Sequence, residues 1–198
     1  MEPVDDLEPV GGPRLARNIA IAVAVVVAAL VIVLATRPNS GERARQSELF
    51  GQLAPAVEGT TLDGDEVSID QFRGRWVVLN FFASWCTPCI REHPELVRFD
   101  DAHREAGDAV LLSVTFNDAT DDAQAFFDER GGEWPVIDDQ ANAFGVAYGV
   151  AQLPETFVIA PDGTVVYRFA GEVTRAAIEE VIGFYSTPGD GSHEEDAS

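Results

Sequence analysis

Two cysteines, Cys86 and Cys89, are the only ones in the 198-residue chain, and they lie two residues apart in the run SWCTPCIREHP. A disulfide between them would stabilise the fold only modestly, because the chain-entropy model gives a stabilisation of about 2 kcal/mol for a loop of about four residues and about 4.7 kcal/mol for one of about 100. Two thiols at this spacing can instead pass between dithiol and disulfide with little backbone movement, and the spacing lowers the pKa of the first thiol. The pattern therefore favours redox chemistry.

Metal binding is the alternative use of such a pair. A structural zinc site needs a second pair of ligands, and the chain has no further cysteine. His93 could join Cys86 and Cys89 as a third ligand, and otherwise we expect it to be structural or exposed. The metal alternative stays open, while the redox interpretation, which we favour, needs no metal and no cofactor beyond the disulfide itself.

Charge and length limit the classes of partner. The formal net charge is −21, which argues against nucleic acid because phosphate binding needs basic patches. The chain is long enough for one core-bearing domain with appendages. Residues 1–18 are acidic and rich in Pro and Gly, and we expect the acidic tail over 187–198 to be disordered because it is low in hydrophobic residues.

An uncharged apolar stretch, IAIAVAVVVAALVIVLA, runs from Ile19 to Ala35. This is about the shortest length that crosses a bilayer as a helix. A cleaved signal peptide would have a basic start and a shorter apolar core, although the residues VLA at its end leave cleavage open, and a buried core helix is a third interpretation. We expect a single-pass transmembrane anchor over 19–36, between a cytoplasmic tail over 1–18 and a linker over 37–49.

The orientation of that anchor is argued from chemistry. Two arginines precede the apolar stretch and three follow it closely, so the positive-inside rule leans slightly against export, but the rule weakens when a long domain follows. Dithiol motifs act on disulfides, and disulfides persist outside the cytosol. We therefore expect a protein of the cell membrane whose C-terminal domain is extracytoplasmic.

Strand and helix patterns alternate after the linker. The run around LDGDE predicts a β-hairpin, and the apolar run RWVVLNFFA predicts a buried strand that ends at the cysteine motif. The order of elements predicts an α/β fold with a mixed sheet. Strands are expected over 75–83, 109–116, 155–160 and 164–170, and helices over 87–105, 121–132, 140–148 and 174–186.

Two of these runs carry a resemblance to a known family. The stretch VVLNFFASWCTPCIREHPEL and the later YGVAQLPETFVIAPDGTVVYRFAG resemble the thioredoxin fold. More narrowly, they resemble the TlpA/ResA/CcmG (DsbE) group of membrane-anchored thiol-disulfide oxidoreductases. The resemblance covers residues 50–186 and implies a central mixed sheet flanked by helices, with the hairpin as an N-terminal extension.

The resemblance assigns roles within the cysteine motif. Cys86 lies where a strand passes into a helix, and the free N–H groups and dipole of a helix start stabilise a thiolate, so Cys86 is expected to be the exposed nucleophile. Cys89, one turn further and more buried, would resolve the mixed disulfide. Trp85 is implied as a partly exposed contact surface, and Thr87 and Pro88 as the residues that tune the redox potential.

Three residues outside the motif complete the expected site. Pro154 matches the cis-proline of the group, which leaves the backbone of Leu153 free to pair with a substrate strand. Asn80 stands where thioredoxin has a buried aspartate. Glu92 matches a buried glutamate of ResA-like proteins, and a carboxyl group in an apolar pocket holds its proton to higher pH and can exchange protons with the thiols. The alternative is an ordinary exposed glutamate.

The expected function is the reduction of disulfides in exported proteins, with apocytochrome c as the client and a membrane thiol reductant similar to CcdA or DsbD as the electron donor. A general extracytoplasmic disulfide oxidoreductase is the alternative. A copper-handling protein similar to Sco would use a wider Cys-x-x-x-Cys pair, and a peroxiredoxin would place its cysteine in a Thr-x-x-Cys context. A non-catalytic interaction module would not need both cysteines.

Overall fold

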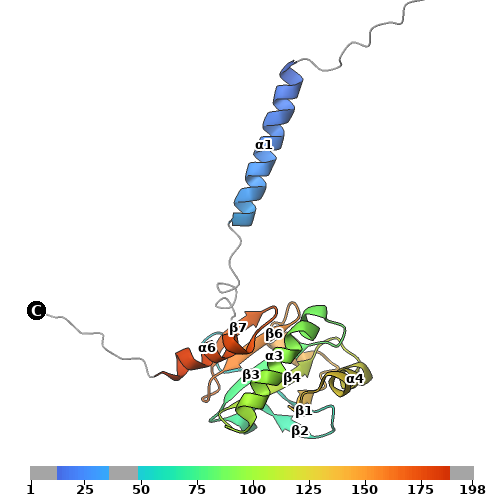
Figure 1. Ribbon diagram of the computed structural model, residues 1–198, viewed down its shortest axis with the longest axis vertical. Coiled ribbons are helices and arrows are strands. Elements are labelled where there is room, and N and C mark those ends of the chain that lie inside the picture. Colours follow the sequence, from blue (N-terminus) through green and yellow to red (C-terminus); the bar gives the residue numbers. More distant parts are fainter. Residues whose placement is uncertain (1–12, 36–48, 188–198) are drawn as a thin grey trace, which may run out of the picture. The chain divides into compact units, whose positions relative to one another are not determined.

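The computed structural model in Figure 1 describes residues 13–35 and 49–187. The chain divides into two compact units, residues 1–39 and 40–198. Most of the tails and the linker expected from the sequence, namely residues 1–12, 36–48 and 188–198, lie outside the described residues.

The first unit contains the helix α1 (Pro13–Ala35). It begins six residues before the apolar stretch, at a proline, which suits the first turn of a helix because the N–H that proline lacks would have no intrahelical partner there. Residues 13–18, expected to belong to the tail, are therefore helical. Side chains of α1 are described over 17–29, where they are exposed, and no helix among the residues so described is long and apolar enough to cross a membrane.

The second unit is built on a five-stranded sheet of order β5-β4-β3-β6-β7. Strands β3, β4 and β5 run parallel to one another, and β6 and β7 are antiparallel to their neighbours, so the sheet is mixed as predicted. The strands are β3 (Trp76–Phe82), β4 (Ala109–Thr115), β5 (Val136–Ile137), β6 (Glu155–Ile159) and β7 (Val165–Ala170), and the helices are α3 (Thr87–Arg104), α4 (Thr120–Arg130), α5 (Ala143–Ala147) and α6 (Arg175–Ser186).

The predicted hairpin forms a separate two-stranded sheet. Its strands are β1 (Glu58–Thr60) and β2 (Glu66–Ser68), paired antiparallel and followed by the short 3-10 helix η1 (Ile69–Phe72). Both the hairpin and η1 pack on one face of the five-stranded sheet, where Val67 and Ile69 join the buried cluster. The hairpin also reaches the edge strand β5, because the N–H of Leu62 donates to the carbonyl of Val136 at 2.9 Å and the N–H of Asp138 donates to the carbonyl of Thr60 at 3.1 Å.

Strand β3 is buried along its whole length because it lies between β4 and β6. Its side chains alternate between the two faces of the sheet, as the two-residue period of a strand requires. Val78 and Phe82 enter the cluster on one face, and Val77, Leu79 and Phe81 enter the cluster on the other. This continuous apolar run places the residues that follow Phe82 at the edge of the sheet.

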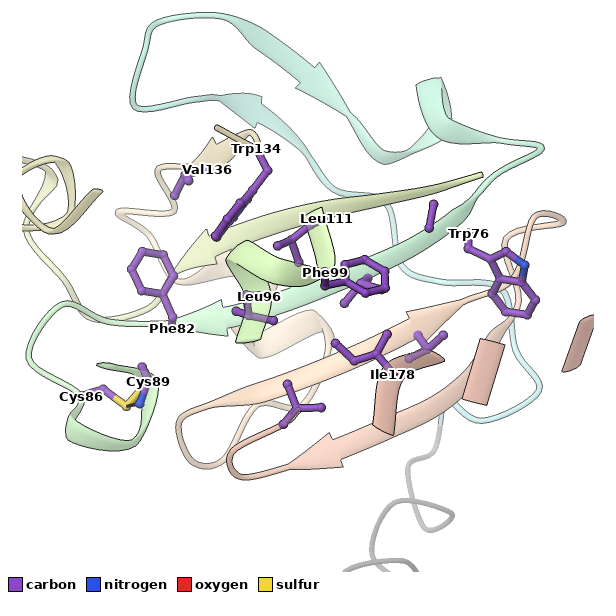
Figure 2. Close-up of a cluster of buried hydrophobic side chains, with 14 of the residues drawn as sticks. Trp76, Phe82, Cys86, Cys89, Leu96, Phe99, Leu111, Trp134, Val136 and Ile178 are labelled. Carbon is purple, nitrogen blue, oxygen red and sulfur yellow. Dashed lines mark hydrogen bonds between the residues drawn. A yellow bond between two sulfur atoms is a disulfide. The ribbon is translucent and has the colours of Figure 1, made fainter. Parts of the chain in front are cut away.

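Helices α3 and α6 cover one face of the sheet, as Figure 1 shows for the second unit. Phe99 of α3 and Ile178 of α6 are fully buried against this face together with Leu111 of β4. In Figure 2 the cysteine pair lies at one end of this cluster, beyond Phe82. The first turn of α3, which carries both cysteines, therefore packs on this hydrophobic cluster.

Helices α4 and α5 differ from the sequence expectation in length, and strand β5 was not expected. Helix α5 starts at Ala143 instead of residue 140, because Asn142 adopts a left-handed φ of 53° and the buried carboxylate of Asp139 accepts the N–H groups of Ala143 and Phe144, both at 2.9 Å. Strand β5 has only two residues, too few to produce a periodic pattern. Helix α4 ends before Gly131, whose φ of 77° stops it.

Candidate active site

The two cysteines form a disulfide at the start of α3, with their Cα atoms 5.2 Å apart. Cys86 is the N-cap of this helix, and the backbone N–H of Cys89 donates to the Cys86 sulfur at 3.2 Å. An N–H group and the positive end of the helix dipole both favour negative charge on that sulfur. The local geometry therefore favours a thiolate at Cys86 once the disulfide is reduced.

The expectation of an exposed Cys86 is wrong for this oxidised form. Cys86 is 4% exposed and Cys89 is 2% exposed, because the bond to Cys89 holds the Cys86 sulfur within the first turn of α3. The two cysteines still differ in access, since an open groove of about 400 Å³ has Cys86 in its wall and not Cys89. The groove is lined by Trp85, Cys86, Thr87, Pro88, Phe116, Ala151, Gln152 and Leu153.

One wall of the groove is Trp85, which is 62% exposed, in agreement with its expected role as a contact surface. Its indole N–H donates to the carbonyl of Asn117 at 2.9 Å. The preceding Ser84 is held by Asp118, which accepts its backbone N–H at 2.6 Å and its hydroxyl at 2.8 Å. The loop after β4 therefore fixes the segment before Cys86, a role that sequence reasoning did not find.

Leu153 also lines the groove, and its peptide bond to Pro154 is cis, as the resemblance implied. Pro154 is buried, and its carbonyl accepts the N–H of Gly171 at 2.9 Å. Within the described part of the chain, the peptide N–H and C=O of Leu153 have no hydrogen-bond partner. These two groups border the groove beside Cys86 and remain available to another chain.

Glu155 holds this part of the groove in place and was not predicted. It is 1% exposed, and its carboxylate accepts the N–H groups of Ala151 at 3.2 Å and Gln152 at 3.3 Å. Its other oxygen accepts from the Nε of Arg168 on β7 at 2.9 Å. The available signal was a single carboxylate in the strand ETFVIA, whose other residues are uncharged, because a buried charge requires a partner.

Glu92 is buried on α3, with 2% of its surface exposed, as the resemblance implied. Burial raises the pKa of Glu92 to about 8, although the hydrogen bonds from Asn80 and from the backbone of Val173 favour the ionised form and act against this rise. The Asn80 amide donates to Oε1 at 2.9 Å and the Val173 N–H donates to Oε2 at 3.0 Å. A carboxyl group of this kind can gain and lose a proton near neutral pH.

His93 points into an aromatic cluster and is structural. It is 4% exposed, its Nε2 lies 2.8 Å from the carbonyl of Gly131, and its ring centroid is 4.8 Å from that of Phe126. Burial lowers the pKa of His93. Among the residues that the structure describes, no group of three or more His, Cys, Asp or Glu side chains is arranged to hold a metal ion.

Comparison with known proteins places this geometry in a family. The family model described as Redoxin matches residues 50–182. The thiol:disulfide interchange protein HelX of Rhodobacter capsulatus is 34% identical over 142 residues, which are 70% of this chain and 78% of HelX. The thiol-disulfide oxidoreductase ResA of Bacillus anthracis is 34% identical over 131 residues, which are 66% of this chain and 75% of ResA.

A solved structure supports the same placement. The crystal structure of a thiol:disulfide interchange protein DsbE from Chlorobium tepidum is 27% identical and superposes with a TM-score of 0.63 over 68% of this chain and 96% of that one. The chain therefore belongs to the Redoxin family and is an enzyme, a thiol-disulfide oxidoreductase of the ResA, HelX and DsbE type.

Proposed function

We propose that the protein reduces disulfides in exported proteins, and that its client is apocytochrome c whose haem-binding Cys-x-x-Cys-His motif has become oxidised. The observation that carries the proposal is the groove, which brings Cys86 beside the unpaired backbone groups of Leu153. Haem attachment needs both thiols of the client free, so a dedicated reductase removes the block. The choice of client rests on the resemblance to the ResA and CcmG group.

The groove suits an extended substrate segment. The free N–H and C=O of Leu153 can pair with the backbone of such a segment, as in the addition of a strand to a sheet edge. Among the residues that the structure describes, no charged side chain lines the groove, so the contacts around the substrate sulfur are apolar or involve neutral polar groups. Recognition by backbone pairing places the substrate disulfide next to Cys86.

The reaction then follows thiol–disulfide exchange. The Cys86 thiolate attacks one substrate sulfur, the substrate disulfide breaks, and a mixed disulfide and one substrate thiolate form. Cys89, as thiolate, attacks the Cys86 sulfur, which releases the second substrate thiolate and forms the Cys86–Cys89 disulfide found here. The substrate gains two electrons and the enzyme loses two, and two protons pass to the substrate thiolates.

Glu92 supplies a place for one of these protons. It lies one helical turn after Cys89 on α3, and its pKa of about 8 is close to that of an ordinary thiol. We propose that Glu92 accepts the proton of Cys89 as this thiol attacks, and that it returns a proton when the disulfide is reduced again. Matched proton affinities make such exchange efficient near neutral pH.

We further propose that the chain is anchored in the cell membrane through the apolar stretch Ile19–Ala35, with the catalytic domain extracytoplasmic. The support is the length and apolarity of this stretch in the sequence and the need of the chemistry for a compartment where disulfides persist. An oxidised enzyme must be recharged, and a membrane thiol reductant similar to CcdA or DsbD would supply the two electrons.

Deletion of the gene tests the client. The amount of c-type cytochromes should fall, and small thiols added to the medium should restore it, because they reduce the client directly. Complementation with the wild-type gene should also restore the cytochromes, whereas a gene carrying Cys86→Ala should not. Normal cytochrome levels in the deletion strain would exclude this client.

A general role in reducing or forming disulfides of exported proteins is the second candidate. It is favoured by the uncharged groove, which offers no charge by which to select one substrate. In the deletion strain it predicts altered redox states in many exported proteins while c-type cytochromes stay normal. Redox-state profiling of exported thiols in the same strain separates the two functions.

A further inference from the structure

A chain of hydrogen-bonded, buried polar side chains runs from Glu92 across neighbouring strands of the sheet. Asn80 on β3, Thr156 on β6 and Ser113 on β4 are each at most 2% exposed. The Asn80 amide nitrogen donates to Glu92 Oε1 at 2.9 Å and to Thr156 Oγ1 at 3.0 Å. Its amide oxygen accepts from Ser113 Oγ at 3.5 Å, a long contact, and Ser113 Oγ accepts the indole N–H of Trp134 at 2.8 Å.

These contacts are those of an ionised Glu92. Both carboxylate oxygens accept from an N–H group, Oε1 from Asn80 and Oε2 from the backbone of Val173. A neutral carboxyl group carries one O–H donor, which needs an acceptor, and a buried donor without one is costly. The protonated form of Glu92 therefore requires a different arrangement of its neighbours.

Only one of the two contacts can change. The Val173 N–H belongs to the backbone and can only donate, so Oε2 stays an acceptor. Because the carbonyl oxygen of a neutral carboxyl group is the better acceptor, this contact favours the proton on Oε1. There it would meet the Asn80 amide nitrogen, which is also a donor. An asparagine side chain, however, carries a donor and an acceptor that exchange places when its amide turns over.

We propose that the Asn80 amide turns over when Glu92 takes up a proton, so that Asn80 is the positioning residue that lets Glu92 exist in both protonation states. After the turn, Asn80 Oδ1 accepts the O–H of Glu92 and the hydroxyl of Thr156, and Nδ2 donates to Ser113 Oγ. Three hydrogen bonds of Asn80 are exchanged for three others, and the only covalent change is the O–H bond on Glu92. Toward Asn80, the Thr156 hydroxyl changes from acceptor to donor and the Ser113 hydroxyl changes from donor to acceptor, which a hydroxyl group can do.

The charged and titratable groups described around Glu92 do not remove the need for the Asn80 amide to turn over. Strands β3 and β6 present the neutral Asn80 and Thr156. The loop between β7 and α6 presents Glu172, which raises the pKa of Glu92 and is itself paired with Arg91 of α3. The cysteines at the start of α3 carry no charge in the disulfide form. The use of the turn in catalysis rests on the proposed function, whereas the turn itself rests on these contacts alone.

Nuclear magnetic resonance can detect the turn directly in the oxidised full-length chain, kept in detergent micelles. Cross-relaxation should connect the Asn80 amide protons to the Thr156 methyl group when Glu92 is ionised, and to the Ser113 β-protons when Glu92 is neutral. The change should follow the titration of the Glu92 carboxyl carbon. In Glu92→Gln, the new amide nitrogen would meet Asn80, so this variant should show the turned pattern at every pH.

Ser113→Ala supplies a second measurement on a protein with an intact Glu92. It removes the acceptor that the turned amide needs, while the contact it removes from the other arrangement is long, so the pKa of Glu92 should fall by about one unit. Ser68→Ala, which removes a hydroxyl outside the chain of contacts, should leave that pKa unchanged. An Asn80 pattern that stays the same in Glu92→Gln and in ionised wild type would overturn the proposal, whether or not the enzyme reduces any client.

Discussion

At the scale of single residues, position distinguishes the two cysteines more than exposure does. Both are almost fully buried in the disulfide form, yet only Cys86 lines the groove and receives the N–H of Cys89. Burial also distinguishes Glu92 from Glu95, the other glutamate of α3. Glu95 lies at the surface, and the N–H of Arg175 lowers its pKa, whereas burial raises the pKa of Glu92.

Replacement of Glu92 should change the reactivity of the reduced enzyme. A carboxylate near the thiols disfavours the thiolate, so Glu92→Gln should lower the pKa of the Cys86 thiol by about one unit. The rate of alkylation of Cys86 as a function of pH measures this value. Glu105→Gln, a change of an exposed residue at the end of α3, serves as the matched control, and an unchanged profile in Glu92→Gln would show that Glu92 does not act on the thiols.

Glu92 should also make the stability of the oxidised protein depend on pH. Its pKa is about 8 in the folded protein and 4.5 ordinarily, so between these values the folded state binds the extra proton and stability falls as pH rises. Each unit of difference corresponds to about 1.4 kcal/mol. Denaturant unfolding at pH 5 and pH 9 should show a loss that Glu92→Gln lacks.

The lowered pKa of His93 acts in the opposite direction, and only below its ordinary value of 6.5. It is the same in both proteins, so the difference between wild type and Glu92→Gln isolates the contribution of Glu92. Parallel pH profiles for the two proteins would contradict a buried, proton-binding Glu92.

At the scale of elements, the groove is made by two loops, and each is held by a carboxylate. Asp118 fixes the segment before Cys86, and Glu155 fixes the loop of residues 151–153 next to the cis-proline. Without these carboxylates neither loop would keep its conformation, because a loop has few backbone hydrogen bonds of its own. The shape of the substrate site is thus set by polar contacts outside the cysteine motif.

Glu155→Gln should loosen one wall of the groove. It leaves Arg168, whose side chain is 16% exposed, without its charged partner, and we expect a loss of about 2 kcal/mol in the free energy of unfolding. The KM for a peptide disulfide should rise, while the reaction with a small aromatic disulfide should change little. Asp70→Asn, which breaks the exposed pair with Arg73, should cost less than about 1 kcal/mol. Equal effects of the two changes would remove the special role of Glu155.

Local pattern predicted most elements, and tertiary contacts decided the rest. The strand at Trp76–Phe82 and the helix from Thr87 follow from a continuous apolar run and a helical period, which residues close in sequence create. Strand β5 exists because it pairs with β4, and the start of α5 depends on the carboxylate of Asp139. Such contacts leave little trace in local sequence.

The site divides in the same manner. The cysteines and Pro154 were predictable because the motif and the LPETF run carry them. The contacts of Ser84 with Asp118 and of Glu155 with Arg168 join residues from different elements. Sequence reasoning from one chain has no means to pair such residues.

At the scale of the whole molecule, the proposal combines a catalytic domain with a membrane anchor. The anchor stays a prediction, and fractionation of cells tests it: the protein should sediment with membranes and resist extraction with carbonate. A variant lacking residues 19–35 should appear in the soluble fraction. Recovery of the native protein as a soluble form that starts near Thr36 would show that the apolar stretch is a cleaved signal.

The central claim is that Cys86 attacks the substrate and Cys89 resolves the intermediate. The most direct test incubates reduced Cys89→Ala with a peptide that contains an oxidised Cys-x-x-Cys-His motif and identifies covalent adducts by mass spectrometry. Our account predicts a stable mixed disulfide through Cys86 in Cys89→Ala, and little or none in Cys86→Ala. Equal trapping by Cys86→Ala, or no adduct with either variant, would contradict it.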